Sequence, residues 1–461
     1  MIGQAPPREA LAHRPTASLR LGERNALLAV GDGVCGIAGS LVAEMSWAGL
    51  GRRTISVNLV VGVFFGIGWV IALLLVHGYA ALAPRSRMYS AVSTSKAAVP
   101  VAALALVAFF VQPYAINRPS LLLSVAVGGA LIVIFRVTVA RLLLRDAFAT
   151  PTILITEADI DQEVRQALEA ARFEYRIIEW VPVRVAGEHL NGFANRLISA
   201  VERHRPPEML VGTLTGPPLE AVAECSIATG TSVRSLSTLL EQYLARVPLD
   251  QVSPSWILGL PSGRLMDRPA LLLRRVLDVS LAALISLPLF VITPLIAVIV
   301  RLDSPGPLYF RQTRVGQFGD EFTIFKFRTM RLDAEQAGPQ WTSAADARLT
   351  RAGRVLRPMR IDEWPQIMNI WRGEMSFIGP RPERPEFVRI LEQELPHYRA
   401  RLLVKPGLTG WAQVNAGYAS SMSDSARKLE YDLYYVKYRG LRLDMQVLML
   451  TVFVVLGRRG R

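Results

Sequence analysis

Four long apolar runs in the first third of the chain restrict its fold more than any other feature. Each is long enough to cross about 30 Å of hydrocarbon. The chain is 51% hydrophobic, more than is usual for a soluble protein. Helices in a soluble core would carry a polar stripe, and these runs carry little of one. We therefore predict four transmembrane helices within the N-terminal part, at residues 25–47, 56–78, 98–116 and 119–144 of the region 25–146.

Positive charge flanks these runs unequally. One side of the membrane receives only three of the flanking cations, Arg52, Arg53 and Arg118. The other side receives Arg8, Arg14, Arg20, Arg24, Arg85, Arg87, Lys96, Arg136, Arg141 and Arg145. Because Lys and Arg are concentrated in cytoplasmic loops, we expect the basic segment 1–24 and residue 146 to face the cytoplasm.

The net charge of +14 also bears on the kind of partner. In a soluble protein such an excess would suggest nucleic acid, but beside apolar runs it favours anionic lipid and phosphorylated substrates. We therefore predict no nucleic-acid partner. Cys35 falls in an apolar run and Cys225 in a polar segment, so neither a disulfide nor a thiolate metal site is expected.

Residues 147–250 alternate between short apolar strands and amphipathic helices. This alternation predicts a parallel sheet of Rossmann-like type. The first strand-to-helix turn, residues 155–159, has no glycine and contains two acids that would repel a pyrophosphate. We interpret this domain as structural or regulatory, without a dinucleotide site. Residues 251–268 are rich in Pro, Ser and Gly and are expected to be a linker.

A fifth apolar run covers residues 269–301 and contains Asp278, Pro288 and Pro294. Four crossings leave the chain in the cytoplasm, so a complete fifth crossing would place residues 302–461 outside. The prolines can instead break the helix so that it enters the bilayer and returns, provided that the freed backbone groups find partners. A kinked but complete crossing fits the pattern equally well.

The last domain, 302–461, contains an adjacent acid pair, Asp362 and Glu363, directly after a basic segment. Adjacent acids among cations suit chemistry on phosphate, because one acid can attack while the other holds Mg²⁺ or moves a proton. Pro365 fits the first turn of a helix, which would place both acids near its positive end. The alternative is a purely structural pair of capping acids.

Several cations are candidates for binding phosphate. Arg351, Arg354, Arg357 and Arg360 recur every three residues and predict a basic stripe on a helix. A solvated face is the alternative. Because the stripe leads directly into the acid pair, we assign function to Arg357 and Arg360 and leave the other two open.

Two further segments supply candidates. Lys326 and Arg328 alternate with aromatic residues, which predicts a strand with both cations on one face, toward phosphate or simply toward solvent. Arg381 lies between two prolines, and a rigid turn suits bidentate phosphate binding. Asp432 is a candidate for a second metal contact or a ribose contact, or else a surface acid on an aromatic helix.

The region from about 270 to 461 resembles a known family. Its matching blocks, in order, are Leu302–Pro307, Arg311–Gly316, FKFRTM at 325–330, DEWPQIMNIWRGEMSFIGPRP at 362–382, KPGLTGWAQVN at 405–415 and YDLYYVKY at 431–438. These are similar to the bacterial sugar transferases, the monotopic polyprenyl-phosphate phosphoglycosyl transferases. The N-terminal part resembles the long members, which have four membrane spans and a degenerate Rossmann-like domain.

This resemblance implies an enzyme that transfers a sugar-1-phosphate from a UDP-sugar to undecaprenyl phosphate and releases UMP. It implies that Asp362 is the nucleophile and carries the phosphosugar, and that Glu363 assists through Mg²⁺, which both acids would bind, or through proton transfer. It also implies roles for Lys326, Arg381 and Asp432, which occupy motif positions of the family. The expected fold is a membrane protein of mixed α and α/β class, with its catalytic domain on a re-entrant helix at the cytoplasmic face of the bacterial inner membrane.

Some alternatives stay open. One alternative is that the protein is a membrane scaffold of a polysaccharide assembly complex and that its catalytic domain is vestigial. The intact motifs argue against this alternative. A membrane-anchored nucleotide-sugar dehydratase is disfavoured because the glycine-rich turn is missing. The family places a Ser-Pro break in the re-entrant helix, but neither Pro288 nor Pro294 follows a serine. No residue identifies the sugar, for which glucose or galactose is the expectation by analogy, and a homodimer through the membrane helices is plausible.

Overall fold

A computed structural model describes most of the chain, which divides into two compact units, Met1–Leu244 and Ala245–Arg461. The described residues are 21–48, 59–76, 78–79, 87–111, 118–143, 149–157, 162–172, 174–183, 190–214, 216–252, 256–257, 259–260, 268–331, 334, 348–416 and 421–456. Several flanking cations of the orientation argument lie outside them, namely Arg8, Arg14, Arg20, Arg52, Arg53, Arg85 and Arg145, as do most of the predicted linker and part of the turn at 155–159.

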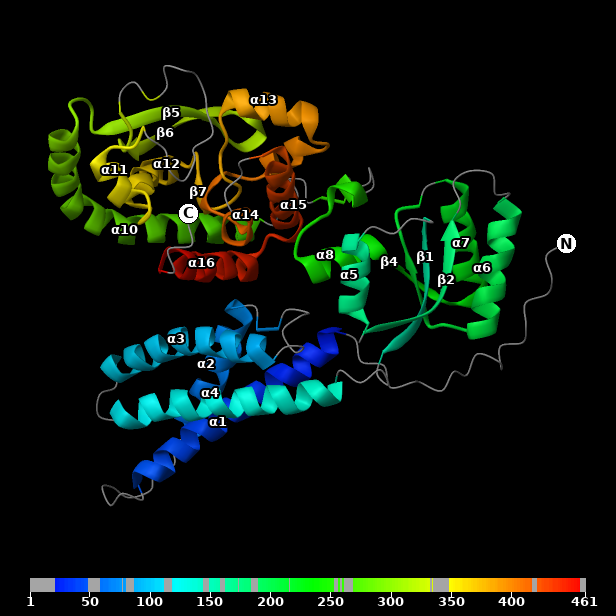
Figure 1. Cartoon of the computed structure of the whole chain (residues 1–461). Helices are drawn as coiled ribbons and strands as arrows, with labels where there is room; N and C mark the ends of the chain where they lie inside the picture. The colour runs from blue at the N-terminus through cyan, green and yellow to red at the C-terminus, as the bar shows by residue number, and fades with distance from the viewer. Residues whose placement is uncertain are drawn as a thin grey trace. The chain divides into compact units, whose positions relative to one another are not determined.

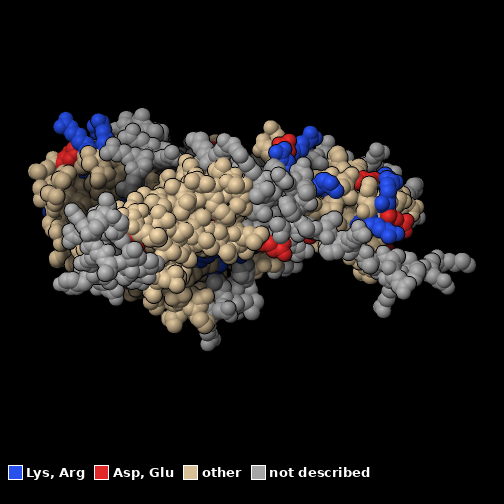
Figure 2. All heavy atoms as spheres, turned by 90° about the horizontal axis from the view of Figure 1, so that it is seen from below, with Lys and Arg blue, Asp and Glu red and all other residues tan. Residues whose placement is uncertain are grey.

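The first unit begins with four helices, α1 (Leu21–Ala48), α2 (Leu59–Leu75), α3 (Arg87–Val111) and α4 (Arg118–Leu143). By length and composition α1, α3 and α4 can each cross a membrane, and α2 is a shorter apolar helix of 17 residues. Seen from below, α1 and α4 present a broad face without charged side chains (Figure 2). These helices characterise the chain as a multi-pass membrane protein.

Helix α3 begins eleven residues before the apolar run predicted at 98–116. Its polar first half is compatible with the helix because the hydroxyls of Ser93 and Thr94 donate hydrogen bonds to the carbonyl of Ser90. Lys96 therefore lies inside a helix and not in a loop, which corrects its assignment as a flanking charge.

Glycines bring the backbones of α1, α2 and α4 close together. A Cβ atom added to Gly39 of α1 would lie 2.4 Å from the Cα atom of Gly128 in α4. One added to Gly66 of α2 would lie 2.7 Å from the carbonyl oxygen of Gly33 in α1. Small residues at such crossings are typical of helices that associate in membranes, where packing replaces the hydrophobic effect.

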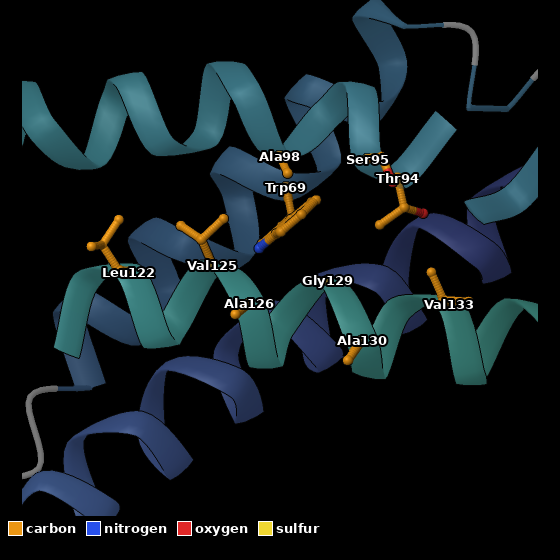
Figure 3. Close-up of a pocket in the computed structure, with 10 residues that line it drawn as sticks. All are labelled: Trp69, Thr94, Ser95, Ala98, Leu122, Val125, Ala126, Gly129, Ala130 and Val133. Atoms are coloured by element: carbon orange, nitrogen blue, oxygen red, sulfur yellow. The ribbon is translucent and has the colours of Figure 1, made fainter. Parts of the chain in front are cut away.

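Helix α3 packs less closely on its neighbours. A cavity of about 360 Å³ separates it in part from α2 and α4. Trp69 of α2 and Thr94 of α3 lie on one side of this cavity, and small residues such as Ala126 and Gly129 of α4 lie on the other (Figure 3). Half of the residues that α4 contributes to the lining, Ala126, Gly129 and Ala130, have short side chains or none.

A buried ion pair joins α1 to α4. Arg136 Nη2 lies 2.7 Å from Asp32 Oδ2, and the two side chains are 3% and 0% exposed. The Tyr79 hydroxyl donates to Asp32 at 2.8 Å, and Arg136 Nη1 donates to the carbonyl of Gly78 at 2.7 Å. The prediction that Arg136 is a flanking surface charge is therefore wrong, since its charge is matched by an acid in α1.

We predict that this ion pair determines the stability of the helix bundle. Removing one partner leaves a buried charge unpaired, which typically costs about 3 to 5 kcal/mol. Arg136→Leu and Asp32→Leu should each lower the unfolding temperature in detergent sharply, as measured by fluorescence-detected size-exclusion chromatography after heating. The double variant should recover much of the loss. A double variant no better than either single one would contradict the prediction.

The rest of the first unit is a four-stranded parallel sheet covered by helices on both faces (Figure 1). The strand order is β2-β1-β3-β4. The strands are β1 (Thr150–Glu157), β2 (Tyr175–Val183), β3 (Glu208–Val211) and β4 (Ser232–Ser235). The helices are α5 (Gln162–Ala171), α6 (Leu190–His204), α7 (Pro217–Thr229) and α8 (Leu236–Leu244).

Alternating apolar residues along the strands explain the two layers. Ile153 and Ile155 of β1 pack with α6 and α7, whereas Leu154 packs with α5 and α8. Because successive side chains of a strand point to opposite faces, both faces of the sheet are buried. The prediction of strands alternating with helices around a parallel sheet is confirmed.

The second unit contains two small two-stranded sheets and several helices. The strands are β5 (Tyr309–Val315) and β6 (Glu321–Phe327), which are antiparallel, and β7 (Ser376–Ile378) and β8 (Gly407–Thr409), which are parallel. The helices are α10 (Arg268–Asp303), α11 (Arg351–Leu356), α12 (Ile367–Arg372), α13 (Pro385–Glu394), α14 (Trp411–Asn415), α15 (Met422–Tyr438) and α16 (Leu441–Leu456). The described residues of this unit also form the 3-10 helices η4 (Leu249–Gln251), η5 (Gln317–Gly319), η6 (Ile361–Gln366) and η7 (Tyr398–Leu403).

Helix α10 contacts the rest of this unit at both of its ends. Near its start, Arg275 donates hydrogen bonds to the carbonyls of Ile370 and Trp371. At its end, Asp303 accepts a hydrogen bond from the backbone N–H of Ala352. Figure 1 shows α10 lying along one side of the unit and bending before it reaches β5.

The other face of α10 is exposed and apolar. Its most exposed side chains include Leu284, Leu287, Phe290, Val291 and Leu295. By length and composition α10 also qualifies as a helix that can enter a membrane. Helix α16, in contrast, buries Leu443 and Val447 in the core of the unit, so this short apolar helix packs on the domain.

Candidate active site

Glu363 lies at the centre of a cluster of cations. Lys326 Nζ, near the end of β6, is 2.9 Å from Glu363 Oε1, and Arg381 Nη2 is 2.6 Å from the same oxygen. Arg360 Nη1 lies 3.6 Å from Oε2. Glu363 is only 6% exposed, so these contacts are formed largely out of water. The structure therefore brings together three cations that the sequence singled out separately.

The backbone before the acids has an unusual conformation. Arg360 has a φ of 57°, in the left-handed region that side chains disfavour, and it directly precedes η6. This turn ends the basic stripe and places Asp362 and Glu363 in the first turn of η6, as predicted. The helix is of 3-10 type, and Pro365 lies near its end instead of in its first turn. Strained residues of this kind cluster at functional sites.

The two acids have different electrostatic surroundings. Burial raises the pKa of Asp362, the negative charge of Glu363 raises it further, and the result is a pKa of about 6. Burial also disfavours the ionised form of Glu363, but the charges of Arg381 and Lys326 outweigh it and hold its pKa well below the usual range. Within the described part of the chain the carboxylate of Asp362 makes no hydrogen bond. Glu363 is thus a fixed charge, and Asp362 is a carboxylate free to react.

Arg381 is carried by a turn that only glycine permits. The N–H of Gly379 donates to the carbonyl of Thr409 at 2.9 Å, and the N–H of Gly407 donates to the carbonyl of Pro380 at 2.9 Å. A Cβ atom on Gly379 would lie 2.2 Å from the carbonyl oxygen of Lys405. The backbones of the two motif segments at 379–382 and 405–410 are therefore in direct contact and hydrogen-bonded to each other. This contact fixes the position of the backbone that carries Arg381.

A second buried network supports the same turn. Arg401 donates to Asp432 Oδ2 through Nε and Nη2, at 2.9 and 2.8 Å, and its Nη2 also donates to the backbone carbonyl of Arg381 at 2.9 Å. Its Nη1 donates to the hydroxyl of Tyr398. Asp432 is 2% exposed, so its interpretation as a surface acid is wrong. Its geometry favours support of the Arg381 turn over direct contact with a metal or a ribose.

The remaining predicted cations divide between two locations. Arg357 donates to the Thr329 hydroxyl, and its charge lowers the pKa of Asp362, which connects it to the site. Arg351 and Arg354 are exposed on α11. The prediction that Arg328 faces phosphate is wrong: β6 ends one residue earlier, and the guanidinium is buried where it donates to the carbonyls of Ser304 and Pro305.

Sequence reasoning missed three charged residues near Arg381. Arg314 on β5 donates to the carbonyl of Pro382 at 2.9 Å and lies 3.7 Å from Glu383. Burial lowers the pKa of Arg314 to about 10. Arg401 and Lys428 were also missed, although both stand close to motif blocks that were recognised. Spacing carries no signal for Arg314 and Arg401, because their partners come from distant parts of the chain.

The acid pair can contribute only part of a metal site. No group of three or more metal-ligating side chains is found among the described residues. Both oxygens of Glu363 already receive cations, whereas the carboxylate of Asp362 is available. Mg²⁺ commonly binds through one or two carboxylates together with substrate phosphates. The residues present therefore fit a Mg²⁺ ion held by Asp362 and a phosphorylated ligand. Glu363 does not fit as a metal ligand, because cations already contact both of its carboxylate oxygens.

Comparison with known proteins identifies the family. A family model described as "Bacterial sugar transferase" matches residues 269–458. The chain is 39% identical over 238 residues to a UDP-glucose:undecaprenyl-phosphate glucose-1-phosphate transferase of Caulobacter vibrioides, and the match covers 50% of this chain and 89% of that protein. The chain therefore belongs to the bacterial sugar transferase family.

Two longer relatives are also similar. A UDP-N-acetylgalactosamine-undecaprenyl-phosphate N-acetylgalactosaminephosphotransferase of Aeromonas hydrophila is 40% identical over 239 residues, which cover 51% of this chain and 54% of that protein. A UDP-glucose:undecaprenyl-phosphate glucose-1-phosphate transferase of Xanthomonas campestris pv. campestris is 36% identical over 232 residues, covering 50% and 48%. The chain thus spans about half the length of these relatives.

We predict that the Arg401–Asp432 pair stabilises the second unit. Asp432→Asn leaves the guanidinium of Arg401 buried without its counter-charge, which should cost about 3 to 5 kcal/mol. The measurement is the unfolding temperature of the purified protein in detergent. Glu392→Gln, which removes an exposed pair with Arg399, is the control and should change stability little. Equal unfolding temperatures for the two variants would contradict the prediction.

Proposed function

We propose that the protein transfers a sugar-1-phosphate from a UDP-sugar to undecaprenyl phosphate and releases UMP. The observation that carries this proposal is the division of roles in the acid pair. Asp362 has a carboxylate without a hydrogen-bond partner in the described part of the chain, and the adjacent Glu363 is held by three cations. Such a site offers a nucleophile beside positive charge, which suits attack on a phosphoryl group.

The proposed reaction has two displacements at the same phosphorus atom. In the first, an oxygen of Asp362 attacks the sugar-bearing phosphorus of the donor, and the bond from that phosphorus to the bridging oxygen breaks. UMP leaves with the electron pair of that bond, and the phosphosugar stays on Asp362. In the second, a phosphate oxygen of undecaprenyl phosphate attacks the phosphorus and releases the Asp362 carboxylate. Covalent capture thus divides one transfer into two steps.

Each side chain of the cluster has a part in this scheme. Lys326 and Arg381 offset the negative charge that gathers when the donor diphosphate approaches an acid pair. Glu363 keeps those two cations in place and, through its charge, helps to hold the pKa of Asp362 near 6. Mg²⁺, when bound by Asp362 and the donor phosphates, would supply further positive charge at the departing oxygen.

We further propose that α10 enters the bilayer and returns to the same side. Two observations support this: both ends of α10 contact the same unit, and the exposed face between them is apolar. Two prolines inside the helix provide the places where it can bend. The catalytic unit would then lie at the cytoplasmic face of the bacterial inner membrane, where UDP-sugars are available and the acceptor phosphate is exposed.

The sugar is the open part of the substrate assignment. The matched relatives carry names with glucose and N-acetylgalactosamine, so a UDP-hexose or UDP-N-acetylhexosamine is the proposed donor class. The parallel-sheet domain is proposed to be structural or regulatory, and the membrane helices are proposed to support a homodimer. UMP release measured over a panel of UDP-sugars identifies the donor.

The nucleophile assignment predicts that Asp362→Asn abolishes UMP release. An amide at this position cannot attack phosphorus or carry the phosphosugar. The test is UMP release in the presence and absence of undecaprenyl phosphate, together with mass spectrometry of the wild-type protein for a phosphosugar adduct on Asp362. Retained turnover in the variant, or full rescue of polymer synthesis by Asp362→Ala in cells, would contradict the assignment and favour a scaffold.

The first step should also depend on pH. The pKa of Asp362 is about 6, and only its ionised form can attack. The rate of the UMP burst measured without acceptor should therefore fall below pH 6, by about tenfold per pH unit. The charge of Arg357 lowers this pKa, so Arg357→Gln should move the decline to higher pH. Arg351→Gln, which removes an exposed charge of the same stripe, is the control and should leave the profile in place. Coincident profiles for all three proteins would refute the assignment.

A further inference from the structure

Lys428 on α15 forms no ion pair with any residue that the structure describes. It lies in a half-buried position one helical turn before Asp432, so the two side chains share a face of α15. Within the described part of the chain its Nζ atom makes no hydrogen bond and no ion pair. The nearby charges that act on it are those of Glu383, Arg381, Asp432 and Arg401.

The acids among these neighbours are already paired with other cations. Asp432 is bound by Arg401, and Glu383 lies 3.7 Å from Arg314. Arg381 in turn is bound to Glu363. Lys428 therefore adds positive charge near Arg381 that these acids do not pair with.

Such an arrangement is costly for the free protein. Burying an ammonium group without a partner disfavours its charged form, and burial indeed lowers the pKa of Lys428. A fold under selection for stability alone gains nothing from this charge, since a methionine of similar shape would avoid the cost. A ligand that brings negative charge would offset the free-energy cost of burying this ammonium group.

We propose that Lys428 binds a phosphate oxygen of the donor's nucleoside diphosphate, together with Arg381. The inference rests on the proposed function and adds to it a ligand contact from α15, outside the acid pair and the turn after β7. Lys428 would hold the nucleotide-bearing phosphate and balance the charge that UMP gains as it leaves. The contact explains why positive charge exceeds negative charge around Arg381.

A structural role for Lys428 is the alternative. Oδ1 of Asp432 has no hydrogen-bond partner among the described residues, and Lys428 is one turn away from it. If Lys428 serves to pair with Asp432, its loss should destabilise the protein. If it serves the donor, its loss should leave stability unchanged or improve it while binding weakens. The two roles therefore predict changes of opposite kind.

The test compares Lys428→Met and Lys428→Arg with Arg427→Gln. Arg427 is the preceding residue on α15, is 44% exposed and lies 3.8 Å from Glu430, so its variant removes one charge from the same helix without touching the site. The measurements are KM for the UDP-sugar, kcat for UMP release, the unfolding temperature, and the shift of that temperature by UDP. Each uses the full-length protein in detergent or nanodiscs.

We expect Lys428→Met to raise KM for the donor by on the order of tenfold to a hundredfold, as for the loss of one charge-assisted hydrogen bond. It should reduce the UDP-induced temperature shift without lowering the unfolding temperature of the free protein. Lys428→Arg should retain most of the affinity, and Arg427→Gln should match the wild type.

Two results would overturn the inference. One is a donor KM of Lys428→Met equal to that of Arg427→Gln, and the other is a lowered unfolding temperature with an unchanged UDP shift. If the wild-type protein releases no UMP with any UDP-sugar, the proposed function fails instead. The UDP-induced temperature shift then still decides whether Lys428 binds a nucleoside diphosphate.

Discussion

The enclosure of Glu363 by Lys326, Arg360 and Arg381 is the interaction on which the catalytic unit depends. It joins three segments that are far apart in the sequence, namely β6, the turn before η6 and the turn after β7. Glu363 is buried, and without these cations it would be an unpaired buried charge, which is costly. The same contacts keep Glu363 ionised, and that permanent charge makes its neighbour Asp362 harder to ionise. One dipeptide thus provides both a structural anion and a reactive acid.

The two units treat buried charge differently. In the helix bundle, Asp32 and Arg136 match one for one. Arg136 also donates to the Gly78 carbonyl, and the Tyr79 hydroxyl donates to Asp32. Nothing in that network requires a ligand. Around Arg381 the cations outnumber the carboxylates. Since uncompensated charge in a protein interior needs a counter-charge from somewhere, the imbalance itself points to an anionic substrate.

Local signals explain which features could be predicted from the sequence. Apolar length predicted the membrane helices, and alternation predicted the parallel sheet. The acid pair lies at a helix start as predicted, although Pro365, on which that prediction rested, lies near the end of the helix. The family motifs marked Lys326 and Arg381 as site residues, but their shared contact with Glu363 was not predicted from the sequence.

The failures have a common physical cause in long-range pairing. Arg136 resembles a flanking charge until Asp32, 104 residues earlier, is seen beside it. Arg328 binds a backbone carbonyl at Pro305, and Asp432 binds the guanidinium of Arg401. Both partners lie in other segments of the chain, so neither contact was predicted. The packing around β6 could not be predicted from residue spacing either. Ile324 and Phe327 both pack with residues of α10. Lys326 lies between them on the strand, within about 7 Å of each along its axis. With α10 in the bilayer as proposed, that proximity holds the reactive acid near the depth of a lipid phosphate, where a soluble donor and a membrane-bound acceptor can reach the same carboxylate in turn.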